Sequence, residues 1–345
     1  MLASLTTRKL CKLSLRRLRS IQRGRISNFF ILSTFVITLR VLQASYSLKP
    51  RCTLTFSKIG SYGRLGNQLF QLAALVSLAH THGAHWRLPS GIEHTQLGKL
   101  FDVSKYASHE LGVKVTVLEE EEKDILKLCK NGNVIDLEGY FQSLKHVEKA
   151  QPQLRRILRL SKRLRSQVLT DFPQLIARNV VTLHVRRGDY TSLGSYYKIL
   201  EPQYYLMTLS LIKDFDEILV VSDDPMWVHT TLIPAIRERY AAVSIIVSTG
   251  HSSLYDFVLL HAGRHIILAN SSFSWWAAYL HLIYGNVDRD VFVASTWFNE
   301  TGPYAVKNLK FVRGEFFPKE WNLVFYSGRD DSQSSKMYGL PLVPQ

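Results

Sequence analysis

A regular alternation of short apolar runs with helical segments begins at Asn179 and constrains the fold of this 345-residue chain more than any other feature. Short runs rich in β-branched residues are typical of parallel strands that helices cover on both faces. The pattern predicts a doubly wound α/β domain that binds its ligand at the carboxyl ends of its strands. The predicted strands are 180–185, 218–221, 243–247, 266–269 and 291–294.

The helical segments carry signals for their ends. Pro202 is expected to begin one helix, Ser253 to cap the next, and Gly285 to end a third. Upstream, a strand-like alternation precedes a glycine-rich loop at 60–66 and a helical pattern that stops at Gly83. A basic amphipathic helix is predicted at 151–168, near a domain boundary. The predicted domains are an N-terminal α/β domain at 51–165, a C-terminal α/β domain at 170–325 and a loose tail at 329–345.

The first 50 residues hold ten Lys and Arg residues and no acid. An apolar segment at 26–48, interrupted by Arg40, follows most of them, and basic residues before a span favour a cytosolic N-terminus. We therefore predict a basic cytosolic tail at 1–25 and a signal-anchor segment at 26–48, with the body in the lumen. An arginine-rich, acid-free amphipathic stretch at 13–21 leaves a mitochondrial presequence as the alternative.

Of the formal net charge of +15, about five charges remain for the rest of the chain. A mildly basic body suits a small anionic substrate at least as well as nucleic acid, which is not expected as a partner. Cys52 and Cys129 can form a disulfide in an oxidising compartment or remain two buried thiols. Asn270 and Asn299 open glycosylation tripeptides, and Asn299 is the predicted acceptor.

The segment HVRRGDY at 184–190 is the strongest functional signal. Alternation along the preceding strand directs His184 and Arg186 to one face and Arg187 to the other. A guanidinium at the end of a buried strand needs a partner. That partner is either Asp189, in an internal ion pair, or a bound diphosphate, since arginine holds phosphate with a two-donor fork. In the second case Arg186 and Arg187 are both predicted donor-binding residues.

The glycine-rich loop contains Gly63 and Gly66 and lacks the Lys-Ser/Thr of a P-loop. It is either a tight turn or a place where a ligand approaches the backbone, with the amides of Asn67 and Gln68 at the helix start.

A small-residue turn after the fourth predicted strand contains Ser271 and Ser272 and opens a helix, whose N-terminus suits a phosphate. Trp275 and Trp276 in that helix are expected in the core. Asp256 either completes a capping box or accepts hydrogen bonds from a guanine.

The chain contains five motifs in this order: GRLGNQLFQ at 63–71, EGYFQ at 138–142, HVRRGDY at 184–190, VSDD at 221–224 and NSSFSWWAAY at 270–279. Together they resemble the alpha-1,2-fucosyltransferases of glycosyltransferase family 11, over residues 53–325. The resemblance implies a GT-B-like arrangement of two facing Rossmann-like domains, with GDP-fucose held mainly by the C-terminal one. Similarity to the wider fucosyltransferase group implies Arg186 on the β-phosphate, His184 and Asp256 near guanosine, Ser272 near the diphosphate and Asn67 near the fucose.

The resemblance further implies an inverting transfer of L-fucose from GDP-β-L-fucose to the 2-hydroxyl of a galactose on a glycan, in the Golgi membrane. A different glycan or protein acceptor is the first alternative, and a non-catalytic nucleotide-sugar-binding protein is the second. The chain departs from the family pattern at Arg64 and Val228. The base is not defined by a motif, because Gly194 stands where alpha-1,6 enzymes have a glutamate, and Asp189 is a candidate by position alone.

No cofactor or metal ion is expected. The segment Asp288-Arg289-Asp290 has the Asp-x-Asp pattern of metal-dependent glycosyltransferases, but Arg289 would repel a cation. Asp223 and Asp224 have the wrong spacing for that pattern and are interpreted as a pair at a strand end.

Overall fold

The computed structural model describes residues 52–108, 112, 114–130, 132–177, 179–285, 289–309 and 314–326, all within the unit Arg51–Gln345. The predicted basic tail, signal anchor and C-terminal tail lie outside these residues. Among the residues described, no helix is both long enough and apolar enough to span a membrane.

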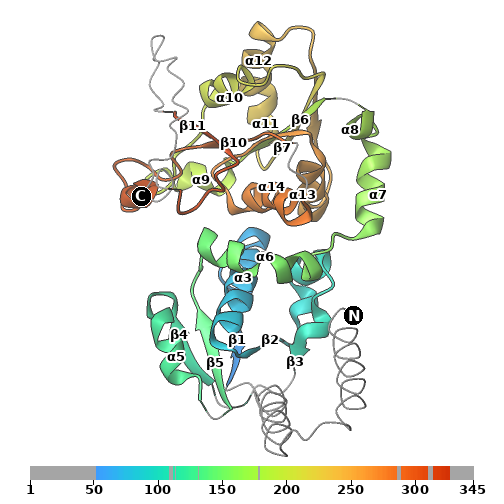
Figure 1. Ribbon diagram of the computed structural model, residues 1–345. Coiled ribbons are helices and arrows are strands. Elements are labelled where there is room, and N and C mark those ends of the chain that lie inside the picture. Colours follow the sequence, from blue (N-terminus) through green and yellow to red (C-terminus); the bar gives the residue numbers. More distant parts are fainter. Residues whose placement is uncertain are drawn as a thin grey trace, which may run out of the picture. The chain divides into compact units, whose positions relative to one another are not determined.

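The first sheet is built from the N-terminal part of the described chain (Figure 1). All its strand pairs are parallel, and its order is β3-β2-β1-β5-β4. Its strands are β1 Cys52–Thr55, β2 His85–Pro89, β3 Ala107–Ser108, β4 Lys114–Leu118 and β5 Asn133–Glu138.

The second sheet contains the five predicted strands and one more at its edge. Its order is β11-β10-β9-β6-β7-β8, and every pair is parallel. The chain therefore winds outward from β6 in both directions, which is the doubly wound topology, and the predicted parallel α/β fold is confirmed. The strands are β6 Val180–Val185, β7 Glu217–Ser222, β8 Ser244–Ser248, β9 His265–Ile267, β10 Val291–Ala294 and β11 Asn322–Val324.

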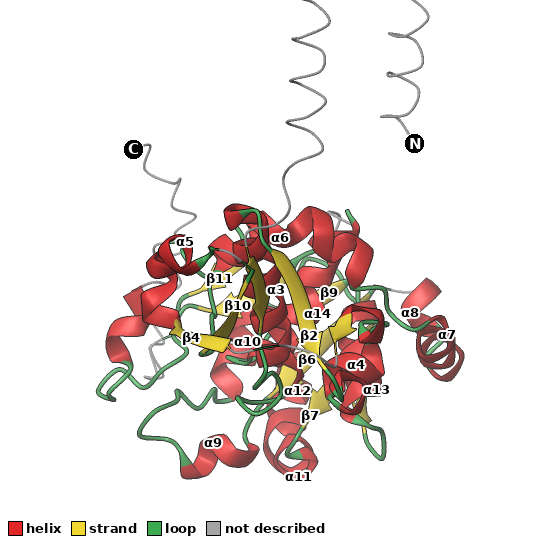
Figure 2. Cartoon of the chain, turned by 90° about the horizontal axis from the view of Figure 1, so that it is seen from below, coloured by secondary structure: helices red, strands yellow, loops and turns green. Residues whose placement is uncertain are grey.

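Helices surround the strands (Figure 2). The predicted ends at Gly83 and Gly285 are confirmed, because both glycines adopt the left-handed conformation that terminates a helix. The α-helices of the described residues are α3 Leu65–His82, α4 Gln96–Leu100, α5 Ile125–Leu128, α6 Leu144–Ile157, α7 Lys162–Asp171, α8 Gln174–Ala177, α9 Gly188–Ser192, α10 Pro202–Leu209, α11 Pro225–Trp227, α12 Ile233–Arg239, α13 Ser253–Ala262 and α14 Ser272–Tyr284.

The predicted helix at 151–168 is wrong. Its residues divide between α6 and α7, which are separated at 158–161. Leu160 leaves helical geometry to form a bridge with Phe101 and to donate its N–H to the hydroxyl of Tyr284 at 3.3 Å. These contacts with distant residues override the helical pattern.

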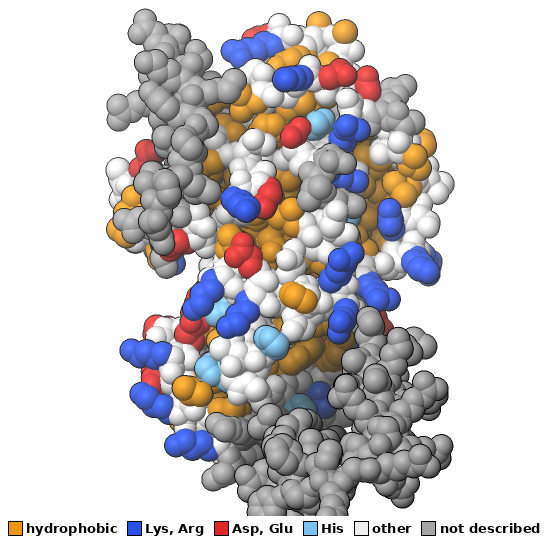
Figure 3. Space-filling view, in the orientation of Figure 1, with side chains coloured by type: hydrophobic (Ala, Val, Ile, Leu, Met, Phe, Trp, Pro, Cys, Tyr) orange, Lys and Arg blue, Asp and Glu red, His pale blue; other side chains and the backbone are white. Residues whose placement is uncertain are grey.

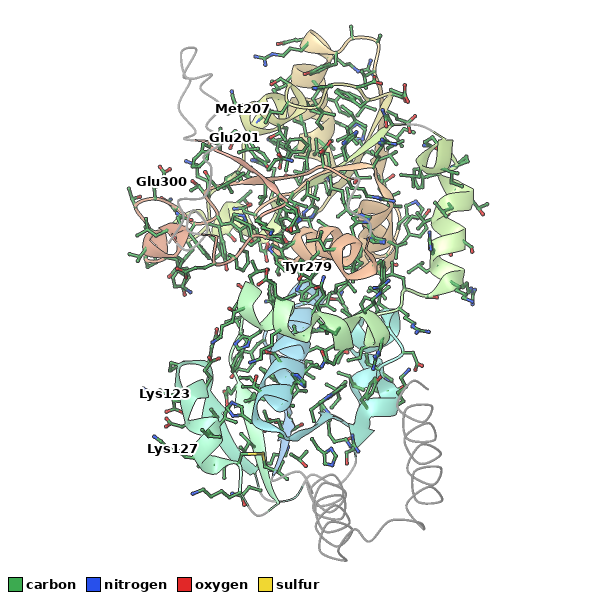
Figure 4. All side chains as sticks on the ribbon, in the orientation of Figure 1. Lys123, Lys127, Glu201, Met207, Tyr279 and Glu300 are labelled. Atoms are coloured by element: carbon green, nitrogen blue, oxygen red, sulfur yellow. A yellow bond between two sulfur atoms is a disulfide. The ribbon has the colours of Figure 1, made fainter. Side chains whose placement is uncertain are left out.

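Helix α14 lies against α3 (Figure 1). The two helices meet through a fully buried aromatic cluster. Phe70 of α3 lies 4.7 Å from Trp275 and 5.3 Å from Trp276, measured between ring centroids. Tyr279, labelled in Figure 4, stacks on Trp275 at 4.8 Å. The core role predicted for both tryptophans is confirmed. The cluster links α3, which follows β1 of the first sheet, to α14, which follows β9 of the second sheet.

Cys52 and Cys129 form a disulfide between β1 and the end of α5, visible in Figure 4 as the bond between two sulfur atoms. Both residues are buried. On the face drawn in Figure 3, Lys and Arg side chains are interspersed with acidic, polar and hydrophobic side chains.

Candidate active site

The carboxyl edge of the second sheet brings the strongest motifs together. Val185 of β6 is in register with Ser222 of β7, so the residues that follow each strand are neighbours. The hydroxyl of Tyr190 donates to the carbonyl of Asn270 at 3.1 Å, which joins HVRRGDY to the turn after β9. Because the strand order reverses between β6 and β9, this edge is where a doubly wound sheet binds ligands.

Arg186 faces two carboxylates at this edge. Its Nη1 lies 2.8 Å from Oδ2 of Asp223, and its Nη2 donates to Asp189. The guanidinium also lies 5.3 Å from the ring centroid of Tyr190, and its side chain is only 16% exposed. The internal ion pair that the sequence offered as one alternative is therefore present. It holds Arg186 at the carboxyl edge of the sheet.

Arg187 is directed to the opposite side of the strand, as the alternation predicted. Its Cζ lies 4.1 Å from the ring centroid of Trp227, a favourable cation–π contact. Its nitrogens lie 3.6 Å from the carboxylate of Glu201, labelled in Figure 4, and 3.7 Å from that of Asp224. The structure thus surrounds the Arg187 side chain with protein groups and separates it from the partners of Arg186.

His184 is buried beside Phe273, with 5.6 Å between ring centroids. Burial, together with the charge of Arg186, lowers the pKa of His184 to about 3. The imidazole is therefore neutral at physiological pH. Its Nδ1 is buried and has no hydrogen-bond partner among the described residues.

The N-terminus of α14 joins two further predicted residues. Ser271 caps the helix by accepting from the N–H of Phe273 at 3.3 Å. The hydroxyl of Ser272 donates to Oδ1 of Asn67 at 2.9 Å, and Gln142 donates to the same oxygen at 2.8 Å. Residues from three motifs thus meet at one amide oxygen.

Of the two alternatives for the glycine-rich loop, the one in which a ligand contacts the backbone amides of Asn67 and Gln68 does not fit the hydrogen bonds of these amides. Helix α3 begins at Leu65, and both amides donate to the carbonyl of Arg64, at 2.9 and 3.1 Å. The Gln68 side chain is also internal, since it accepts from the N–H of Leu97 at 2.9 Å. These amides are therefore not available to a ligand.

The two glycines of this loop permit close packing. A Cβ on Gly66 would lie 2.4 Å from the backbone carbon of Ser272, so glycine is required where α3 meets α14. Gly63 has a φ of 92° and would place a Cβ 2.0 Å from Nδ2 of Asn67. The absence of a Cβ at both glycines permits the close contacts around Asn67 and Ser272.

Asp256 lies at the same edge of the sheet, beyond the end of β8. Its Oδ1 accepts from the hydroxyl of Ser248 at 2.8 Å, and burial raises the pKa of its carboxyl group. The capping predicted for its helix is wrong: Ser252, not Ser253, is the N-cap, and its hydroxyl accepts from the N–H of Tyr255 at 3.3 Å. The capping-box alternative for Asp256 is therefore excluded.

Asp223 is the residue that sequence reasoning missed. Besides pairing with Arg186, it accepts from the N–H of Arg187 at 2.8 Å. A Cβ on Gly188 would lie 2.5 Å from Oδ2 of Asp223, which explains the glycine in the motif. Consecutive strands are usually neighbours, so the carboxylates after the second predicted strand were an available signal.

The glycosylation tripeptides differ in their surroundings. Asn270 is buried, and its Nδ2 donates to the carbonyls of Lys198 and Trp297, at 2.7 and 2.8 Å. It is therefore inaccessible to glycosylation in the folded protein. Asn299 is half-buried and donates to the carbonyl of Gly194 at 2.7 Å, and its glycosylation stays a prediction.

The Asp-x-Asp segment has a local structural role where it is described. Nη1 of Arg289 donates to the carbonyls of His261, Ala262 and Gly263 at the end of α13. The carboxylate of Asp290 lies 2.9 Å from Nδ1 of His265. Asp288 lies outside the described residues.

Fold and site together define an α/β protein with a doubly wound parallel sheet. The carboxyl edge of this sheet presents an arginine held by two carboxylates, a neutral histidine and a helix N-terminus. The chain belongs to glycosyl transferase family 11, whose profile matches residues 33–293. The family predicted from the five motifs is therefore confirmed.

Curated relatives cover parts of the chain. The Escherichia coli O-antigen biosynthesis glycosyltransferase WbnK is 32% identical over 126 residues, or 35% of this chain and 39% of the relative. An alpha-1,2-colitosyltransferase of Escherichia coli is 30% identical over 172 residues, or 48% of this chain and 56% of the relative. Galactoside alpha-(1,2)-fucosyltransferase 2 of Rattus norvegicus is 27% identical over 244 residues, or 64% and 66%. The chain thus spans less than two thirds of the length of each.

Proposed function

We propose that this chain transfers L-fucose from GDP-β-L-fucose to the 2-hydroxyl of a galactose residue, with inversion at the anomeric carbon. The observation that carries the proposal is the meeting of Arg186, neutral His184 and the N-terminus of α14 at the switch point of the second sheet. A guanidinium and a helix N-terminus together suit a diphosphate. The names of the relatives from Rattus norvegicus and Escherichia coli support alpha-1,2 transfer.

In the proposed reaction the bond between the anomeric carbon and the β-phosphate oxygen breaks while the galactose 2-hydroxyl attacks the opposite face. Negative charge develops on the departing GDP, and Arg186 stabilises it with preorganised donors. The hydroxyl of Ser272 and the positive end of the α14 helix dipole add to this stabilisation. We place the fucose near Asn67, whose side-chain oxygen is held by Ser272 and Gln142.

We assign the general base to Asp189. Its side chain is 45% exposed, so an acceptor hydroxyl can reach it. It contacts Arg186 and lies 3.8 Å from Arg64 of the glycine-rich loop. A diphosphate that takes over the guanidinium of Arg186 would release a carboxylate oxygen of Asp189 for proton transfer.

We further propose a GT-B-like arrangement, with the donor on the second sheet and the acceptor on the first.

Purified protein should be tested against a panel of GDP-fucose, nucleotide-activated colitose and unrelated nucleotide sugars, with galactosides, other glycans and peptides as acceptors. Linkage analysis of the product identifies the oxygen that is modified. Binding of GDP without turnover on any acceptor would contradict the proposal and favour a nucleotide-sugar-binding protein.

We expect transfer to continue in excess EDTA, since cationic and dipolar groups of the protein are assigned to the diphosphate. Initial rates should be compared after EDTA treatment and after readdition of manganese or magnesium. A strict requirement for manganese would contradict the assignment and direct attention to Asp223 and Asp224.

We propose that the chain is a single-pass type II protein of the Golgi membrane, with the catalytic region in the lumen. The disulfide between Cys52 and Cys129 supports an oxidising compartment. A secreted form that begins at Arg51 should retain transfer and lose membrane association, because every motif follows that residue. Maturation of the full chain inside mitochondria, or its fractionation with cytosol, would contradict this proposal.

A further inference from the structure

The EGYFQ motif forms a strained turn after β5. Phe141 has a φ of 50° and Gly139 a φ of 146°, and Phe141 is the only described residue other than glycine with a positive φ. The backbone N–H of Tyr140 and the backbone N–H of Phe141 donate to the same carboxylate oxygen of Glu119, at 3.0 and 2.8 Å. Such strain persists only where surrounding contacts hold it, and it concentrates at functional sites.

This turn directs consecutive aromatic side chains in opposite directions. Phe141 is fully buried against Phe56, at 5.7 Å between centroids, whereas Tyr140 is 50% exposed. Tyr62 lies edge-on to Tyr140 at 5.9 Å, and the hydroxyl of Tyr62 donates to Glu138. The turn therefore presents the Tyr140 ring, braced on one side, at the surface.

Two connections place Tyr140 beside the donor site. Gln142, two residues further on, shares Oδ1 of Asn67 with Ser272 at the start of α14. Arg64, two residues after Tyr62, lies 3.8 Å from the carboxylate of Asp189. Burial raises the pKa of Tyr197, and the nearby hydroxyl of Tyr140 raises it further.

We propose that Tyr140, braced by Tyr62, forms the acceptor subsite and stacks on the apolar face of the galactose ring that receives the sugar. This inference rests on the proposed function and adds the residue that selects the acceptor. A tyrosine ring offers a large, rigid contact surface at low entropic cost. The acceptor hydroxyl would then lie between the first sheet and Asp189.

The test compares Tyr140→Ala, Tyr140→Phe and Phe325→Ala. Phe325 is 49% exposed and directly follows the edge strand β11, which β10 and β9 separate from β6. Its replacement by alanine is therefore a matched loss of an exposed ring away from the proposed subsite. We expect Tyr140→Ala to raise the KM for the galactoside by roughly two- to tenfold, with the KM for GDP-fucose unchanged. Tyr140→Phe keeps the ring and should restore the acceptor KM, and Phe325→Ala should match wild type.

An unchanged acceptor KM in Tyr140→Ala, or equal increases in the KM of donor and acceptor, would overturn the subsite. Wild-type protein that binds GDP but transfers no fucose to any acceptor would instead overturn the proposed function. Acceptor binding measured by saturation-transfer NMR in the presence of GDP provides a readout independent of turnover, and Tyr140→Ala should weaken that signal. A melting temperature equal to that of wild type would show that the variant is folded.

Discussion

Replacement of Arg186 by lysine is expected to lower the kcat of fucosyl transfer by roughly ten- to a hundredfold. Lysine keeps the charge but loses the planar two-donor fork that would grip the β-phosphate as negative charge develops there. The loss should fall on kcat more than on the KM for GDP-fucose, because the contact strengthens in the transition state. The measurements are initial rates, GDP affinity by calorimetry and the melting temperature.

Arg187→Lys is the matched control, one residue away. Arg187 stacks on Trp227 and lies near Glu201 and Asp224, so its replacement should lower the melting temperature while transfer by the folded protein changes little. The ion pairs of Arg186 with Asp189 and Asp223 allow a purely structural role as the competing interpretation. Near-normal transfer by Arg186→Lys, or a loss explained by unfolding alone, would establish that interpretation and remove Arg186 from the diphosphate site.

Removal of the disulfide is expected to have the largest effect on stability. Cys52 and Cys129 are separated by 77 positions, and closure of a loop of that length restricts the unfolded chain by about 4 kcal/mol. The double variant Cys52→Ala, Cys129→Ala should therefore unfold at a temperature lower by roughly 10 °C. Calorimetry or circular dichroism under non-reducing conditions measures the shift.

Wild-type protein unfolded in the presence of reductant is the control for the two lost side chains. If loss of the crosslink causes the lower melting temperature, reduced wild type should approach the melting temperature of the double variant. Reductant should not change the melting temperature of the variant itself. Identical melting of wild type with and without reductant would show that the two sulfurs are not joined in solution.

Much of the second sheet was predictable from local sequence. The apolar runs gave the positions of five strands, and Pro202 and Gly285 marked helix ends, because backbone conformation depends mainly on nearby residues. The prediction of one helix at 151–168 was wrong for the opposite reason, because distant contacts interrupt it. Its pattern was helical throughout, yet a bridge to Phe101 and a bond to Tyr284 broke it at Leu160.

The candidate site shows the same contrast between what local sequence predicts and what distant contacts decide. Sequence by itself identified the segments that meet at the candidate site: a strand ending in HVRRGDY, a small-residue turn that opens a helix, and a glycine-rich loop before another helix. Only the tertiary structure decided that Asp223 is the second partner of Arg186, that Gly66 lets α3 approach Ser272, and that Asn67 joins three motifs. The physical reason is that strand order and helix packing bring together residues up to 205 positions apart, and these contacts depend on three-dimensional arrangement rather than on any local pattern.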